Sequence, residues 1–448
     1  MRVSIVHASV VTLLVIAAHA FAAQREGNDC TADDVDRRIA GCTRILQDQG
    51  ETVRNRLGAF INRAIAYKAK GDLERAITDY NEAIRLDPKY ADAYYNRAIA
   101  YKAKGDLDRA IADYNEAIRL NPNDALAYNN RGIAYRAKGE LDRAIADYSE
   151  AIRLEPRDAL AYSHRGYSYQ AKGELDRAIA DYDEAIRLDP RDALAYNNRG
   201  IAYQAKGDFG RAIADYDEAI RREPKDALAR YNRGIAYKAL GDLDRAIADY
   251  GDAVRLNPRD TLAYGHRGYA YQAKGDVDSA LADFSEAIRL DPKNAWAYKN
   301  RGVVYLYGGS LEKARADFKQ AAELAPKDAY SAQWLDIAER RNGLPSHLAQ
   351  ATKQLNMAAW PAPLVRLFLG ETSFDAAIDA AGDKDATRNH RKVCDANLYG
   401  AEFVALQGRK EEALELYQLA AGNCPNDFIE WTAANAALRE LGITPYMQ

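Results

Sequence analysis

One period governs this chain: a 34-residue spacing recurs eight times between residues 57 and 328. In one copy it is marked by Gly132, Tyr135, Ala144 and Pro156. The tyrosine position is filled in every copy, by Tyr67, Tyr101, Tyr135, Tyr169, Tyr203, Tyr237, Tyr271 and Tyr305. A fixed period of this length indicates stacked two-helix units. Such a chain needs no single large core, because each unit packs on its neighbours.

The copy at residues 125–158 shows why each period predicts two helices. Tyr128, Gly132 and Tyr135 stand at i, i+4 and i+7, the stripe of a first helix. Gly139 ends that helix, Tyr148 lies on the apolar stripe of a second, and a proline closes the copy. A heptad coiled coil would not repeat glycine and proline at this interval, so we exclude it.

The order aromatic, Gly, Tyr, Ala, aromatic, Ala, Pro at fixed offsets resembles the tetratricopeptide repeat (TPR) family. All eight copies follow it, with one lapse at Arg230, where Tyr231 stands one place late. The resemblance implies an all-α TPR solenoid of stacked antiparallel helix pairs. It also implies a right-handed superhelix whose concave groove is lined by the first helices.

Residues 1–22 have the features of a signal peptide. Arg2 precedes an uncharged stretch with an apolar centre, and Ala20 and Ala22 supply small residues before a cleavage site after Ala22. Cleavage near Ala22 predicts a periplasmic or secreted protein. The alternative is an uncleaved anchor, although a membrane span needs about 20 solidly apolar residues. No cysteine follows the stretch in a lipobox-like context, which argues against a lipid anchor.

The four cysteines lie outside the eight regular copies, and an even number suits an oxidising compartment. No CxxC pair or paired histidines are present, so we expect no metal site. Residues 23–56 are predicted to hold a half-repeat that caps the first unit. A Cys30–Cys42 disulfide there requires the chain to fold back along the helix.

After the eight units at 57–328, we expect an irregular helical connector at 329–393. The spacing returns in a divergent ninth copy at 394–427, with Gly408, Ala413 and Tyr417. An antiparallel pair brings the two ends of this copy together, so we predict a Cys394–Cys424 disulfide. Residues 428–448 are expected to form a C-terminal capping helix.

The C-terminal third also resembles bacterial envelope TPR lipoproteins that act as adaptors for peptidoglycan hydrolases and proteases. The likeness lies in WLDIAE (334–339), LVRLFLG (364–370), NLYGAEFVALQG (397–408) and NDFIEWTAANAALRELG (426–442). It implies an adaptor role in cell-envelope complexes. This chain departs from those proteins by lacking the lipid-attachment cysteine and by carrying more regular repeats.

The helical period predicts which side chains face the groove. If Tyr128 and Tyr135 point to the partner helix, Leu126, Asn129 and Ile133 lie on the opposite side. The predicted peptide-binding residues on or beside this face are Asn62, Asn96, Asn130, Asn198, Asn232, Lys68, Lys102 and Arg136. Amides can clamp a peptide backbone, and cations favour acidic or C-terminal segments. The alternative is that these residues only keep the surface soluble.

A second pair of positions predicts structural ion pairs. Each copy carries an arginine on the first helix, such as Arg131, and an aspartate on the second, such as Asp147. Antiparallel packing brings the two positions to similar heights, so we expect interhelical Arg–Asp pairs whose role is structural.

The sequence contains no phosphate-binding loop, HExxH or GxSxG motif, so we expect no catalysis, no catalytic residue and no cofactor. A net charge of only −4 argues against nucleic-acid partners. We therefore expect an exported non-catalytic scaffold that binds peptides or partner proteins, and no small-molecule substrate. The alternative is a self-assembling envelope factor without a dedicated peptide ligand, and a homodimer is among the expected assemblies.

Overall fold

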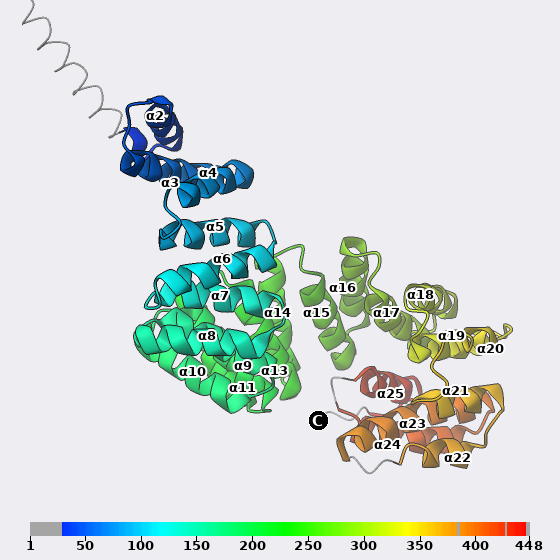
Figure 1. The fold of residues 1–448 in the computed structure, drawn as a ribbon. Helices are drawn as coiled ribbons and strands as arrows, with labels where there is room; N and C mark the ends of the chain where they lie inside the picture. The colour runs from blue at the N-terminus through cyan, green and yellow to red at the C-terminus, as the bar shows by residue number, and fades with distance from the viewer. Residues whose placement is uncertain (1–28, 383–385, 426–427, 445–448) are drawn as a thin grey trace, which may run out of the picture. The chain divides into compact units, whose positions relative to one another are not determined.

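A computed structural model describes residues 29–382, 386–425 and 428–444 (Figure 1). The predicted signal peptide lies outside these residues. The described chain consists of helices, turns and loops, and it contains no strand. None of its described helices is long and apolar enough to cross a membrane. The chain divides into unit 1, which ends at Ala202, and unit 2, which begins at Tyr203.

The helices of unit 1 follow one another along the chain. They are α2 (Val35–Gln47), α3 (Val53–Ala69), α4 (Leu73–Leu86), α5 (Ala91–Ala103), α6 (Leu107–Leu120), α7 (Ala125–Ala137), α8 (Leu141–Leu154), α9 (Ala159–Ala171), α10 (Leu175–Leu188) and α11 (Ala193–Ala205), within which the unit ends. Each helix from α2 to α9 packs on the next.

The regular repeats of unit 2 follow the same plan. Their helices are α12 (Phe209–Arg222), α13 (Ala227–Ala239), α14 (Leu243–Leu256), α15 (Thr261–Lys274), α16 (Val277–Leu290), α17 (Ala295–Tyr307) and α18 (Leu311–Leu324). The remaining helices are α19 (Ala329–Arg341), α20 (Leu348–Ala351), α21 (Ala362–Leu369), α22 (Phe374–Asp379), α23 (Ala386–Leu406), α24 (Lys410–Asn423) and α25 (Ile429–Glu440).

One repeat shows how the sequence makes a helix pair. Asp124 caps α7 by accepting a hydrogen bond from the Ala127 amide. Gly139 takes a φ of 78° in the tight turn before α8, a conformation that side chains with a Cβ disfavour. Tyr148 is fully buried, and its ring lies so close to Gly132 that a Cβ there would stand 2.7 Å from Cε1. The glycine therefore lets the two helices approach across the tyrosine ring.

The predicted Arg–Asp pairs are confirmed within the repeats. In each pair the guanidinium donates two hydrogen bonds to the carboxylate, and the aspartate is buried. The pairs are Arg63–Asp79, Arg97–Asp113, Arg131–Asp147 and Arg165–Asp181 in unit 1, and Arg233–Asp249, Arg267–Asp283 and Arg301–Asp317 in unit 2. Many also reach the preceding repeat, as when Arg131 Nη1 donates to Asn115 Oδ1 at 2.7 Å. Such an arginine therefore joins three successive helices, here α6, α7 and α8.

Both cysteine pairs form disulfides in the structure. Cys30 and Cys42, with Cα atoms 4.5 Å apart, tie the segment before α2 to the helix itself. Cys394 on α23 is joined to Cys424 at the end of α24, with a Cα separation of 5.2 Å. All four cysteines are buried.

The C-terminal helices of unit 2 share one apolar core with the last repeat. Trp334 of α19 is fully buried and stacks on Phe318, with ring centroids 5.6 Å apart. Glu402 of α23 lies in the same region and accepts hydrogen bonds from Tyr307 and Tyr417. The α23–α24 pair is thus bonded to the repeats by polar as well as apolar contacts.

Helix α25 does more than cover the α23–α24 pair. It also contacts α15 and α17, the first helices of two repeats of unit 2. Tyr269 donates a hydrogen bond from its hydroxyl to the Phe428 carbonyl at 2.6 Å, and Arg439 donates to the Ala273 carbonyl at 2.9 Å. Helix α25 therefore occupies the face of these two repeats that corresponds to the predicted groove.

Glu430 of α25 is expected to make unit 2 less stable as the pH rises. Burial, and then the charge of Asp395, raise its pKa from 4.5 to about 8. The unfolded chain releases this proton near pH 4.5 and the folded chain near pH 8, so stability falls across that window. Glu430→Gln should therefore melt at a higher temperature than the unmodified protein at about pH 9 and at nearly the same temperature at about pH 5.

Thermal unfolding followed by tryptophan fluorescence at both pH values measures this difference. Other ionisable groups around Glu430 are Lys299 on α17, the N-cap Asp328 and Tyr330 of α19, and Arg391 and Tyr399 on α23. These groups are present in both the unmodified protein and the Glu430→Gln variant, so their titration affects the two melting temperatures alike. A melting-temperature gap that did not change with pH would contradict the assignment to Glu430.

Candidate peptide-binding groove

The exposed face of the first helices in unit 1 carries a stripe spaced i, i+4 and i+7. On α7 the stripe consists of Leu126, Asn130 and Ile133. The expectation that Asn129 also faces the groove is wrong. Asn129 is buried, and its Oδ1 lies 3.0 Å from His164 Nδ1 on α9. One step along the helix turns a side chain by about 100°, which directs Asn129 at the neighbouring repeat.

Three cations stand at the same position near the ends of α3, α5 and α7: Lys68, Lys102 and Arg136. All three side chains are half-buried. Burial lowers the pKa of Lys68, and burial together with the charge of Arg136 lowers that of Lys102. Arg136 lies over the ring of Tyr167, 4.8 Å from its centroid.

These cations differ from the lysines two residues further along. Lys138 and Lys172 pair with Asp108 and Asp142 at 2.6 Å, and Lys104 pairs with Glu74. For Lys68, Lys102 and Arg136, no carboxylate of the described chain forms an ion pair. The face of unit 1 predicted to line the groove therefore carries positive charge that no carboxylate of the described residues neutralises.

The amides of the predicted site have different surroundings. Asn130 accepts a hydrogen bond from Lys102 Nζ at 2.9 Å and donates to the Tyr95 hydroxyl at 3.1 Å. Asn96 donates to the Asp92 carbonyl of its own helix. Asn62 and Asn198 are half-buried. The structure thus brings Lys102 and Asn130 together across two repeats, with Tyr95 as a third member that the sequence did not single out.

Asn232 belongs to unit 2 and is buried, so its side chain is not an open groove residue. The equivalent faces of α15 and α17 are covered by α25, and Val303 and Asn300 there are fully buried. The face predicted to line the groove is therefore covered at the C-terminal repeats of unit 2.

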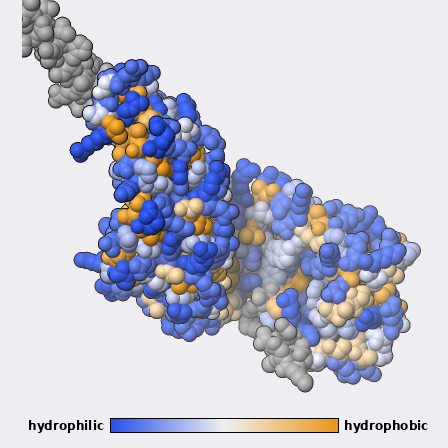
Figure 2. All heavy atoms as spheres, viewed as in Figure 1, coloured by the Kyte–Doolittle hydropathy of each residue, from blue (hydrophilic) through white to orange (hydrophobic). Residues whose placement is uncertain are grey.

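Exposed leucines accompany the cations in unit 1. Leu126, Leu160 and Leu194 begin the stripe on three successive first helices and are 53%, 59% and 60% exposed. On the face drawn in Figure 2, hydrophilic residues predominate and apolar residues form small groups. Of the three leucines, Leu126 shares its helix, α7, with Arg136, and Leu160 begins the next first helix, α9.

His164 and Ser163 do not form a catalytic pair. Burial, and then the charge of Arg136, lower the pKa of His164 to about 4, so the imidazole is neutral at pH 7. Its hydrogen bond is to Asn129 of the preceding repeat. Among the described residues, no group of three or more His, Cys, Asp or Glu side chains is arranged to hold a metal ion.

Comparison with known proteins supports the repeat assignment. Models described as "TPR repeat" match residues 65–105, 132–173, 167–207 and 268–306. Models described as "Tetratricopeptide repeat" match residues 91–124, 113–146, 197–261, 295–328 and 363–428. A comparison with curated proteins found no significant match.

Several solved structures are similar to the chain. YrrB, described as a TPR protein with an unusual peptide-binding site, is 30% identical, with 41% of this chain and 95% of YrrB covered and a TM-score of 0.36. MamA is 30% identical over 37% of this chain and 96% of its own, with a TM-score of 0.35. A TPR protein from Parabacteroides merdae is 24% identical over 55% and 98%, with a TM-score of 0.45. The matches to the family models run through both units and cover more than half of the chain, which therefore belongs to the tetratricopeptide repeat family.

Proposed function

We propose that this protein is an exported, non-catalytic adaptor that holds acidic peptide segments of partner proteins in the groove of unit 1. The observation that carries the proposal is the row formed by Lys68, Lys102 and Arg136, half-buried and without a carboxylate partner. Its setting is a cell-envelope protein complex.

The row favours an anionic ligand for a physical reason. Removing a cation from water without supplying a counter-charge is unfavourable, and two neighbouring cations repel each other. A peptide carboxylate placed between Lys102 and Arg136 relieves both costs through charge-assisted hydrogen bonds. Leu126 and Leu160 can cover apolar side chains of the same segment, because they begin the helices that carry or adjoin the charged row.

Export is supported by features at both ends of the chain. The uncharged N-terminal stretch fits a signal peptide, and both cysteine pairs are disulfide-bonded, which suits an oxidising compartment. The resemblance of the C-terminal third to envelope adaptors points to the same setting.

Binding of a fluorescent oligoglutamate peptide, followed by anisotropy, tests the groove. The protein is expected to bind this peptide and not an oligolysine peptide, with affinity that falls as salt rises. The variant Lys68→Glu/Lys102→Glu/Arg136→Glu should weaken binding by about tenfold or more, since one lost charged hydrogen bond costs about 1.5–3 kcal/mol.

The matched control is Lys70→Glu/Lys104→Glu/Lys138→Glu, which makes the same charge change two residues further along the same three repeats. Those lysines already have acidic partners, so this variant should lose much less affinity. Equal losses in the two variants would show a general charge effect and contradict the site. A pull-down from envelope extract that recovered only the protein itself would contradict the adaptor role and favour self-assembly.

A further inference from the structure

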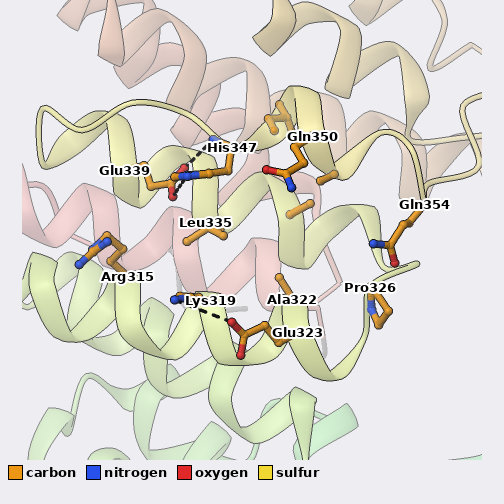
Figure 3. A pocket seen from close by; sticks show the side chains of 13 residues that line it. Arg315, Lys319, Ala322, Glu323, Pro326, Leu335, Glu339, His347, Gln350 and Gln354 are labelled. Atoms are coloured by element: carbon orange, nitrogen blue, oxygen red, sulfur yellow. Dashed lines mark hydrogen bonds and ion pairs between the residues drawn. The ribbon is translucent and has the colours of Figure 1, made fainter.

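A cavity of about 620 Å³ lies where the regular repeats end in unit 2 (Figure 3). Helices α18, α19 and α20 supply its walls. Ala322, Ala332 and Leu335 line it from α18 and α19, and Leu348 closes it from α20. Gln350 and Gln354 stand at its opposite side in Figure 3. Its volume lies within the usual range of about 300–1,000 Å³ for small-molecule sites.

The cavity exists because two large side chains of the repeat are missing there. The position of Ala322 holds isoleucine or valine in all seven earlier copies, and the position of Ala332 holds an aromatic ring in all but one. One repeat earlier, Ile288 and Tyr298 occupy these two positions and pack in the same cluster. With alanine at both, the junction between α18 and α19 lacks the volume of an aromatic ring and a branched aliphatic chain.

Two cations of α18 also line the cavity at the junction between α18 and α19. Arg315 replaces the isoleucine or leucine of the seven earlier copies, and Lys319 stands four residues later on α18. Like charges at this spacing destabilise a helix. Each forms one long ion pair on its own helix. Arg315 Nη2 lies 3.9 Å from Glu312 Oε2, and Lys319 Nζ lies 3.8 Å from an oxygen of Glu323, which also lines the cavity. The Nε atom of Arg315 is buried and has no hydrogen-bond partner.

The cavity lining also includes one buried acid, and this acid already has a partner. Glu339 is buried, and its two carboxylate oxygens accept hydrogen bonds from the backbone N–H of His347 and contact His347 Nδ1 at 2.9 Å and 2.7 Å. Figure 3 shows this pair on the side of the cavity away from Lys319. Glu339 is therefore held by His347 and forms no ion pair with Arg315 or Lys319 in this structure.

We propose that this cavity binds a small aromatic carboxylate. The ring takes the space of the missing tyrosine and isoleucine side chains, between Ala322, Ala332 and Leu335. The carboxylate lies at the α18 wall, where Arg315 and Lys319 provide the donors. The ligand is a small molecule rather than a peptide, and its site lies outside the groove of unit 1.

The probe is 2-naphthoate, measured by isothermal titration calorimetry on the full chain. Saturable one-to-one binding is expected, together with much weaker binding of the neutral analogue 2-naphthalenemethanol. Ala322→Ile/Ala332→Tyr restores the residues of the regular repeats and should abolish binding of both compounds. Arg315→Ile/Lys319→Ser restores regular residues at the charged positions and should weaken naphthoate by about tenfold, the equivalent of 1.4 kcal/mol, with little effect on the alcohol.

Circular dichroism verifies that both variants keep their helix content, which is expected because every substitution introduces a residue used at that position elsewhere in the chain. Unchanged naphthoate affinity in the filled variant would overturn the site. Equal affinity for the acid and the alcohol would overturn the role of the two cations. Absence of binding to the unmodified protein would overturn the proposal as a whole.

Discussion

Replacing Glu402 with alanine is expected to lower the free energy of unfolding of unit 2 by about 4 kcal/mol, as removal of one partner from a buried charged network does. The Glu402 side chain is fully buried. It accepts hydrogen bonds from the hydroxyls of Tyr307 and Tyr417 at 2.6 Å and 2.7 Å, and from Arg341 Nη2 at 2.8 Å. Alanine would leave a guanidinium and two hydroxyls buried without their acceptor.

The network is also the polar link between the repeats and the C-terminal pair. Its members come from α17, α19, α23 and α24, so its loss should loosen the packing of α23 and α24 on the last repeat. Urea unfolding followed by tryptophan fluorescence measures the effect, because all four tryptophans of the chain, Trp296, Trp334, Trp360 and Trp431, belong to unit 2.

Glu412→Ala is the matched control for this prediction. Glu412 lies on α24 and pairs with Arg409 on the surface, so its loss should cost less than about 1 kcal/mol. Glu402→Gln keeps an acceptor oxygen and should fall between the two. If Glu402→Ala and Glu412→Ala had similar midpoints, the buried network would contribute little, and apolar contacts alone would hold the C-terminal pair.

The repeat architecture could be predicted because every copy makes the same local contacts. Tyr148 packs on Gly132 within one helix pair, and Arg131 donates hydrogen bonds to Asp147, sixteen residues later. Such contacts repeat with the period and are visible as aligned positions. The same alignment of copies predicts that Lys102 and Asn130 lie on one side of the first helices, and the two side chains are hydrogen-bonded. The placement of Asn129 on that side is wrong, because one step along the helix turns its side chain toward His164 of the neighbouring repeat.

The C-terminal part of unit 2 could be predicted only in outline. Tyr307 and Glu402 are 95 residues apart, and the Tyr269 contact with Phe428 spans 159 residues. No period connects these positions, so nothing in their spacing indicates that α25 returns to α15 and α17. The cavity between α18 and α19 is partly indicated by the sequence, because Ala322, Ala332 and Arg315 differ from the residues at the same positions of the earlier repeats. These differences indicate a lost contact, and only the structure shows that the space is left as a cavity among the described residues.

Asp147→Ala is expected to destabilise unit 1 by about 3 kcal/mol, the lower end of the range for breaking a buried ion pair. The side chains of Asp147 and Arg131 are only 8% and 17% exposed. Arg131 donates from Nε and Nη2 to the two carboxylate oxygens at 2.8 Å and 2.6 Å. The remaining nitrogen, Arg131 Nη1, donates a hydrogen bond to Asn115 on α6. The arginine side chain therefore cannot turn toward solvent without breaking a contact between repeats.

Glu150→Ala on the same helix supplies the comparison. Glu150 pairs with Arg153 three residues away on the exposed side of α8, and its loss should cost about 0.5 kcal/mol or less. Circular dichroism follows both units, whereas tryptophan fluorescence reports unit 2 alone. Asp147→Ala should therefore shift the unfolding midpoint seen by circular dichroism and leave the fluorescence midpoint nearly unchanged. A shift no larger than that of Glu150→Ala would mean that the Arg–Asp pairs contribute no more to stability than exposed surface pairs.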